Sequence, residues 1–209
     1  MRTWRGLFGA MLALLCFGAC AAELQAGRDF RVIDPPLVAD GSRIEVTEFF
    51  WYGCPHCFDF EPVLAPWAAR LPADVSFRRV PAVFPNDRWT PGARLYYTLE
   101  AMNLVDALHA EVFKAIHVER KRIDEEKHLL DWVASKGVDP AKFRAAWSSF
   151  GVSSRVRQAR ELTLASGLTG VPAMVVHGRY QAVTPGNYGE LITLVDQLVA
   201  RVRAEAGRK

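Results

Sequence analysis

Residues 44–57 read Ile-Glu-Val-Thr-Glu-Phe-Phe-Trp-Tyr-Gly-Cys-Pro-His-Cys, and this stretch decides the fold. Its first seven residues are rich in β-branched and aromatic side chains, which predicts a buried strand over 44–50. Cys54 and Cys57 follow directly, at a spacing that lets their sulfurs exchange a disulfide within one turn of helix. A strand that runs into a CxxC pair at the start of a helix indicates thiol chemistry.

The first 22 residues have the three parts of a secretory signal peptide, which we expect to be removed. Arg2 and Arg5 give a charged start, residues 7–17 are apolar, and small residues precede Glu23. The apolar run is shorter than the about 20 residues that a transmembrane helix needs. Residues 17–20, Phe-Gly-Ala-Cys, also resemble a bacterial lipoprotein cleavage box, so a lipid anchor at Cys20 is an alternative.

Either leader takes the mature chain out of the cytosol, into a compartment where disulfides persist. Because Cys16 and Cys20 belong to the leader, Cys54 and Cys57 form the one close pair of the mature chain.

The composition predicts one compact soluble unit. Half of the 209 residues are hydrophobic and 23% are charged, and a chain of this length suits one domain or one domain with an insert. Loss of the leader lowers the formal net charge from +3 to +1. This balance indicates neither a nucleic acid nor an anionic membrane surface as a partner.

Strand and helix patterns occur in blocks along the chain. The segment 23–40 contains two adjacent prolines, and we expect it to be irregular. A helix should run from Cys54 towards Arg70 and be kinked or broken at Pro62 and Pro66, because each proline removes a backbone donor. Residues 75–80 alternate as a second strand.

From Thr90 to Ser166 the apolar residues recur at helical spacing. Asp139 followed by Pro140 is a good helix start, Ser153 or Ser154 should begin the next helix, and Gly167 is placed to end it. Residues 171–176 and 180–183 then predict a hairpin, and a closing helix follows with one apolar face. The order indicates one mixed sheet interrupted by a helical insert.

The Phe49–Cys57 run, the later Gly170-Val171-Pro172, the leader and the helical insert together resemble the periplasmic DsbA thiol-disulfide oxidoreductases. The resemblance covers essentially all of the mature chain. It implies an α/β, thioredoxin-like fold with an inserted all-helical domain. The corresponding division is a signal peptide over 1–22, a thioredoxin-like first part over 23–86, a helical insert over 87–166 and a thioredoxin-like second part over 167–209.

The chemistry of the pair follows from its place in the helix. Cys54 would sit at the helix N-terminus, where unpaired N–H groups and the helix dipole favour its thiolate. Cys57 is then the resolving thiol, more buried and with the higher pKa. His56 would donate a hydrogen bond or positive charge to the Cys54 sulfur, and Pro55 suits the first helical turn. A stabilised Cys54 thiolate makes the reduced form favourable and the disulfide a strong oxidant.

The resemblance implies two further site features. Val171 and Pro172 correspond to the cis-proline loop that faces the disulfide and offers backbone groups to a substrate peptide. Glu48 corresponds to a buried acid that relays protons at Cys57. Relatives often pair this acid with a lysine on the following strand, but that strand reads Phe-Arg-Arg over 77–79, so the cationic partner of Glu48 stays open.

Other side chains carry weaker signals. His109 and His117 are eight residues apart and share a helix face, yet no acidic or cysteine pattern accompanies them, so we interpret them as structural or surface histidines. Four aromatic residues lie either in the core or along a peptide groove beside Cys54: Trp51, Tyr52, Phe84 and Trp89.

Three functions compete at this point. The first is a periplasmic oxidase that donates the Cys54–Cys57 disulfide to reduced, unfolded exported proteins and that a quinone-linked DsbB-type membrane protein reoxidises, as the resemblance implies. The second is an isomerase or reductase, although residues 23–43 are too few for the dimerisation domain of those relatives. The third is a zinc-binding module, although the mature chain lacks a second ligand pair. We expect a monomer without a metal or cofactor.

Overall fold

The computed structural model describes residues 24–39, 41–123, 125–184 and 186–207. The predicted signal peptide and the alternative lipid anchor at Cys20 lie outside these residues. The predicted α/β fold with a helical insert between strands is confirmed, since five consecutive helices separate the third and fourth strands of a single sheet. The division at residues 86/87 and 166/167 stays a prediction.

The sheet has five strands in the order β1-β5-β4-β2-β3. The strands are β1 (Phe30–Val32), β2 (Ile44–Phe50), β3 (Val75–Pro81), β4 (Ala173–Val176) and β5 (Tyr180–Ala182). Strand β2 runs parallel to β3 and antiparallel to β4, and all its residues after Ile44 are buried. This burial on both faces includes three polar residues, Glu45, Thr47 and Glu48, so their side chains need partners inside the protein.

Strand β1 corrects the prediction that residues 23–40 are wholly irregular. It pairs antiparallel with β5, with Arg31 opposite Gln181. Three residues are too few to show an alternating pattern, so the pairing partner and not the local sequence defines this strand.

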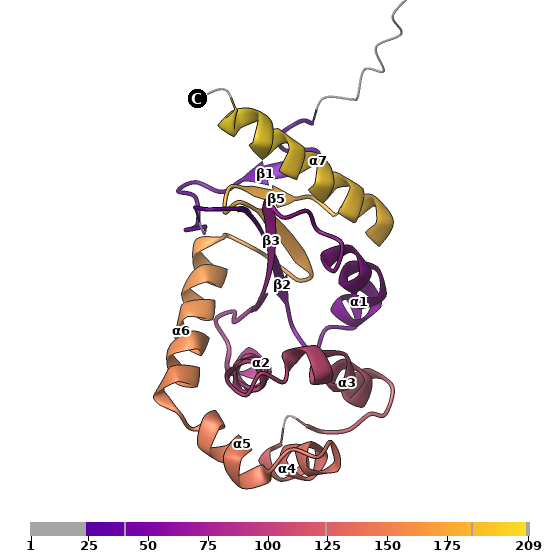
Figure 1. Ribbon diagram of the computed structural model, residues 1–209, viewed down its shortest axis with the longest axis vertical. Helices are drawn as coiled ribbons and strands as arrows, with labels where there is room; N and C mark the ends of the chain where they lie inside the picture. Colours follow the sequence, from indigo (N-terminus) through magenta and orange to yellow (C-terminus); the bar gives the residue numbers. More distant parts are fainter. Residues whose placement is uncertain (1–23, 40, 124, 185, 208–209) are drawn as a thin grey trace, which may run out of the picture.

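Helices cover the sheet on two sides (Figure 1). The helices α1 (Pro55–Ala68) and α7 (Tyr188–Ala206) pack on one face, where α7 contacts β2, β4 and β5. The insert comprises η1 (Asp87–Trp89), α2 (Thr90–Ala101), α3 (Val105–His117), α4 (Glu126–Ser135), α5 (Pro140–Trp147) and α6 (Phe150–Ala165). Figure 1 shows α2 to α5 gathered at one end of the sheet, while α6 runs back towards β4.

Helix α1 continues from Pro55 to Ala68 through both prolines, so of the kink or break that the sequence predicts, the break does not occur. Pro62 and Pro66 lie on the exposed side of the helix, where a carbonyl that loses its intrahelical donor remains open to water. Phe60, Leu64 and Trp67 are buried on the opposite side. Packing of this apolar face against α7 and the sheet therefore holds the helix together despite the missing donors.

Two other helix starts test the cap predictions. Asp139 caps α5 and accepts hydrogen bonds from the backbone of Ala141 and Lys142, as predicted. Helix α6 begins earlier than Ser153, because the Ser149 side chain accepts from Val152 N and serves as its N-cap. No helix of the described residues is both long and apolar enough to cross a membrane.

Candidate functional site: the Cys54–Cys57 pair and its surroundings

The two cysteines lie at the N-terminal end of α1, beyond the last residue of β2. Cys54 is the N-cap residue in an extended conformation, and Pro55 occupies the first turn. Both cysteines are free thiols; Cys54 is 8% exposed and Cys57 is fully buried. Of the two cysteines, Cys54 is therefore the one that retains some solvent-exposed surface.

The surroundings push the pKa values of the two thiols in opposite directions. A hydrogen bond from the Cys57 thiol, backbone N–H groups of Cys57 and His56 and the charge of His56 outweigh burial and lower the pKa of Cys54 to about 6. Burial, followed by the neighbouring Cys54, raises the pKa of Cys57 far above its usual range. Near neutral pH the pair can thus hold one thiolate, on Cys54, and one thiol, on Cys57.

The loop before β4 faces the Cys54 sulfur. The Val171–Pro172 peptide bond is cis, as the resemblance implied, and the Cys54 thiol donates to the Val171 carbonyl at 3.5 Å. His56 is exposed beside this loop, and its carbonyl accepts a hydrogen bond of 3.0 Å from Tyr188 OH at the start of α7. Residues from three distant parts of the chain therefore meet around Cys54.

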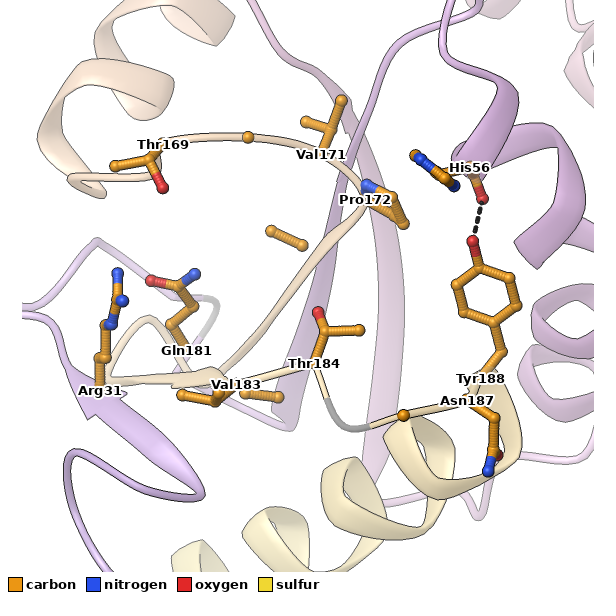
Figure 2. Close-up of a pocket in the computed structure, with 14 residues that line it drawn as sticks. Arg31, His56, Thr169, Val171, Pro172, Gln181, Val183, Thr184, Asn187 and Tyr188 are labelled. Atoms are coloured by element: carbon orange, nitrogen blue, oxygen red, sulfur yellow. Dashed lines mark hydrogen bonds between the residues drawn. The ribbon is translucent and has the colours of Figure 1, made fainter.

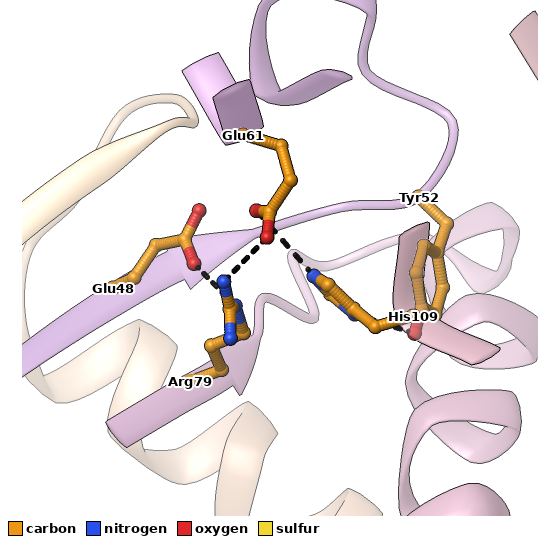
Figure 3. A network of polar contacts seen from close by, with 5 residues as sticks. All are labelled: Glu48, Tyr52, Glu61, Arg79 and His109. Atoms are coloured by element: carbon orange, nitrogen blue, oxygen red, sulfur yellow. Dashed lines mark hydrogen bonds and ion pairs between the residues drawn. The ribbon is translucent and has the colours of Figure 1, made fainter. Parts of the chain in front are cut away.

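Glu48 is buried on β2 and does have a cationic partner. The parallel register places Glu48 opposite Arg79 of β3, and Arg79 Nε donates to Glu48 Oε2 at 3.1 Å. Arg79 Nη2 also donates to Glu61 Oε1 of α1 at 2.6 Å. The cationic partner of Glu48 is therefore Arg79, an arginine in place of a lysine, and it binds two carboxylates (Figure 3).

Burial still dominates the electrostatics of Glu48. It raises the pKa of Glu48 to about 8, because desolvation and the nearby Glu61 outweigh the attraction of Arg79. The pKa of Glu61 moves the other way: burial alone would raise it, but His109 and Arg79 together hold it below its usual range. Glu48 is consequently the carboxyl of this network that can exchange a proton near neutral pH.

The insert contributes two histidines to the same region. His109 of α3 is buried; its Nδ1 is hydrogen-bonded to Tyr52 OH at 2.8 Å, and its Nε2 lies 3.6 Å from Glu61 Oε2. His117 Nε2 donates to the backbone carbonyl of Tyr52 at 2.8 Å. Both histidines share one face of α3, as predicted, and both contact the tyrosine two residues before Cys54.

The four aromatic residues lie in or against the hydrophobic core, and their place along a peptide groove stays a prediction. Tyr52 is buried in the core, whereas Trp51, Phe84 and Trp89 are half-buried. The Trp51 and Trp89 rings pack at a tilt with centroids 4.5 Å apart, and Phe84 and Trp89 pack edge to face at 4.8 Å. The Trp51 ring also covers Gly53, where an added Cβ would lie 2.4 Å from it. Gly53 therefore allows this aromatic cluster to sit directly beside the Cys54 turn.

Sequence reasoning missed Glu61, Arg79 and Tyr188. Glu61 lies four residues after Cys57, so helical spacing alone places it on the same side of α1. Arg79 becomes visible only with the β2–β3 register, and Tyr188 only with the position of α7. Among the residues that the structure describes, no three His, Cys, Asp or Glu side chains form a group that could hold a metal ion.

Comparison with known proteins gives consistent matches along the chain. Residues 45–193 match the family described as the DSBA-like thioredoxin domain. The chain is 40% identical to the thiol:disulfide interchange protein DsbA of Pseudomonas aeruginosa over 200 residues, covering 94% of each chain. It is 42% identical to the DsbA of Bordetella parapertussis over 203 residues, covering 95% of this chain and 96% of the relative. The crystal structure of P. aeruginosa DsbA superposes with a TM-score of 0.84 at 39% identity, covering 90% of this chain and 98% of the other.

Proposed function

Because the chain belongs to the DsbA family of thioredoxin-like thiol:disulfide oxidoreductases, we propose that it oxidises cysteine pairs of reduced, unfolded exported proteins by donating its Cys54–Cys57 disulfide. The observation that carries the direction of transfer is the asymmetry of the pair: the Cys54 pKa of about 6 against the strongly raised pKa of Cys57. A thiolate that is stabilised in the reduced protein favours reduction of the disulfide, and hence oxidation of the substrate.

The proposed reaction has two exchange steps. A substrate thiolate attacks the Cys54 sulfur, the Cys54–Cys57 bond breaks, and Cys57 leaves and takes up a proton. A second substrate thiolate then attacks the substrate sulfur of this mixed disulfide, and Cys54 leaves as a thiolate. The substrate loses two electrons and gains a disulfide, while the enzyme ends with one thiolate and one thiol.

Each nearby residue has a role in this proposal. His56 adds positive charge near the Cys54 sulfur, and Pro55 starts the helix whose N–H groups face that sulfur. Glu48 exchanges the proton that Cys57 gains or loses; its raised pKa of about 8 supports this role. Val171 and Pro172 present backbone groups to the substrate beside Cys54, as the 3.5 Å contact from the Cys54 thiol to the Val171 carbonyl suggests.

The family also suggests the setting of the reaction. We place the mature protein in the periplasm as a soluble monomer, with a quinone-linked DsbB-type membrane protein as the oxidant that restores the disulfide. The isomerase or reductase remains the second candidate, because those enzymes use the same cysteine chemistry with a more reducing pair.

Two measurements test the proposal. The Cys54–Cys57 pair is equilibrated with glutathione, and the oxidised protein is mixed with reduced, unfolded ribonuclease. We expect a strongly oxidising pair and stoichiometric disulfide transfer. A strongly reducing pair would instead support the reductase. In addition, Cys57→Ser whose Cys54 is first activated as a mixed disulfide with thionitrobenzoate should release thionitrobenzoate and form a mixed disulfide with a reduced single-cysteine substrate, while the double variant with Cys54→Ser should form none.

A further inference from the structure

A pocket of about 650 Å³ opens directly beside the active-site cysteines. One wall is the loop Thr169–Pro172, a second is β5 with the residues that follow it, and the third is formed by His56 and Tyr188 (Figure 2). The pocket is continuous with the site, because His56, Val171 and Pro172 belong to both.

The far end of this pocket carries an unused positive charge. Arg31 of β1 lies opposite Gln181, and Figure 2 shows both side chains on the same side of the pocket, across from Thr169. No aspartate or glutamate lines the pocket among the described residues. Over the same part of the chain, the Arg31 side chain makes no hydrogen bond or ion pair, so its charge remains available to a ligand.

The sheet register sets the distance from Arg31 to the active site. Arg31 pairs with Gln181, which pairs with Val175, so Arg31 lies two strands away from β4. Val175 in turn is three residues after Pro172. With about 4.8 Å between strands and about 3.4 Å per residue, the backbones of Arg31 and Pro172 are roughly 14 Å apart. An extended peptide spans this distance in about four residues, and the long arginine side chain shortens the span.

We propose that this pocket binds the segment of a protein substrate next to its reactive cysteine, and that Arg31 selects an acidic residue two to four positions from that cysteine. The inference rests on the proposed function for the identity of the ligand and adds a sequence preference to it. The occupant follows from the pocket's continuity with Cys54, from its length and from the unpaired cation at its end. The other polar lining side chains, which include Gln181, Thr184 and Asn187, suit the backbone of such a segment.

The test measures the preference at Cys54 without depending on the direction of disulfide transfer. Cys57→Ser protein is mixed with equal amounts of two single-cysteine peptides. The two peptides differ only at the position three residues from the cysteine, which is Glu in one and Lys in the other. In one set of peptides this position precedes the cysteine, and in a second set it follows the cysteine. Each peptide is activated as a mixed disulfide with thionitrobenzoate. The Cys54 thiolate attacks the peptide sulfur, thionitrobenzoate leaves, and mass spectrometry gives the ratio of the two adducts. Free cysteine treated alike supplies the reference ratio.

We expect a two- to fivefold excess of the Glu adduct over the reference in at least one set, the range of an exposed ion pair. The excess should disappear in Arg31→Gln, reverse in Arg31→Glu and fade in 0.5 M salt. Arg43→Gln is the matched control, because Arg43 is an exposed arginine at the opposite end of β2, and this variant should keep the excess.

Three results would overturn the inference. The first is equal amounts of the Glu and Lys adducts in both sets, and the second is an equal loss of the Glu excess in Arg31→Gln and Arg43→Gln. The third is that glutathione, activated in the same way, reacts with Cys54 in preference to both peptides and that this preference depends on Arg31. The last result would show that the pocket binds a small thiol compound rather than a segment of a protein substrate. A reducing glutathione equilibrium of Cys54–Cys57 would overturn the oxidase proposal instead, and the adduct ratio would still decide the role of Arg31.

Discussion

The Glu48 carboxylate and the Arg79 guanidinium lie 3.1 Å apart at the same level of two paired parallel strands, with Glu48 1% exposed. Arg79 also holds Glu61, so one buried cation compensates two buried carboxylates. If one of these three side chains is removed, a charge on the others remains in the protein interior without its opposite charge, and water does not reach it there.

Arg79→Met should therefore lower the free energy of unfolding of the reduced protein by about 3–5 kcal/mol at pH 9. Arg203→Met is the matched control, because the Arg203–Asp74 pair is exposed to solvent and should contribute little to stability. Urea unfolding of both variants measures the difference. Equal losses in the two variants would show that Arg79 contributes no more than a surface arginine.

Glu48→Gln tests the raised pKa of Glu48 through the pH dependence of stability. The folded pKa of about 8 lies above the ordinary 4.5, so the folded protein binds the proton more tightly than the unfolded chain does. Glu48 thus makes the free energy of unfolding fall as the pH rises from about 4.5 to 8. The variant should lack this fall, whereas Glu161→Gln, an exposed glutamate on α6, should keep it. Parallel pH profiles for all three proteins would contradict the assignment.

The Cys54 thiolate should be reactive well below the pH at which an ordinary thiol is. Alkylation of Cys54 by iodoacetamide should titrate near pH 6, and Cys57→Ala should raise that pKa more than Cys57→Ser, because serine keeps a hydrogen-bond donor. A rate that titrates near 8.5 would remove the basis of the oxidant mechanism.

The same lowered pKa predicts how the reduced form responds to pH. Its thiolate stabilisation is fully present above the ordinary pKa of about 9 and is lost as the pH falls through 6. The stability of the reduced form relative to the oxidised form should change by up to about 4 kcal/mol across that window. Urea unfolding of the two forms at pH 5 and pH 9 measures this change.

His109→Leu tests the contact between the insert and the active-site helix. The variant removes the partner of both Tyr52 OH and Glu61, and we expect a loss of about 1–3 kcal/mol in unfolding free energy. His128→Leu, an exposed histidine on α4, should cost far less. If the two substitutions prove equivalent, the buried contacts of His109 do not contribute to stability.

Gly53→Ala tests the close contact of Trp51 with the turn before Cys54. The added methyl group would lie 2.4 Å from the Trp51 ring, which also packs against Trp89 with ring centroids 4.5 Å apart. We expect a loss of about 1–3 kcal/mol and a shift in tryptophan fluorescence, because the ring must move. Gly41→Ala is the control, since nothing lies within 4 Å of its added Cβ. Unchanged fluorescence in Gly53→Ala would show that the ring is not confined.

Sequence patterns predicted the elements whose information is local. Strand β2, the hairpin of β4 and β5 and the apolar face of α7 all carry their periodicity within a single segment. Strand β1 was not predicted and the continuity of helix α1 was left open, because strand pairing and burial of one helix face decide them. Both depend on residues far away in the chain.

The site divides in the same way. The cysteines, Pro55, His56, Glu48 and the Val171–Pro172 loop could be named from motifs and resemblance. Arg79 stood in the sequence as one of two adjacent arginines, but only the register shows that it, and not Arg78, faces Glu48. The contact of His109 with Glu61 joins residues 48 positions apart, and no pattern within either helix indicates it.

Tyr52 is attached to α3 at two points, its hydroxyl through His109 and its carbonyl through His117. A single hydrogen bond acts as a pivot, whereas two bonds from one rigid helix also determine orientation. Helix α3 therefore cannot rotate about its own axis without breaking at least one of them. A displacement of α3 that keeps both bonds moves Tyr52 as well, so the position of the insert and the geometry of the turn before Cys54 are linked.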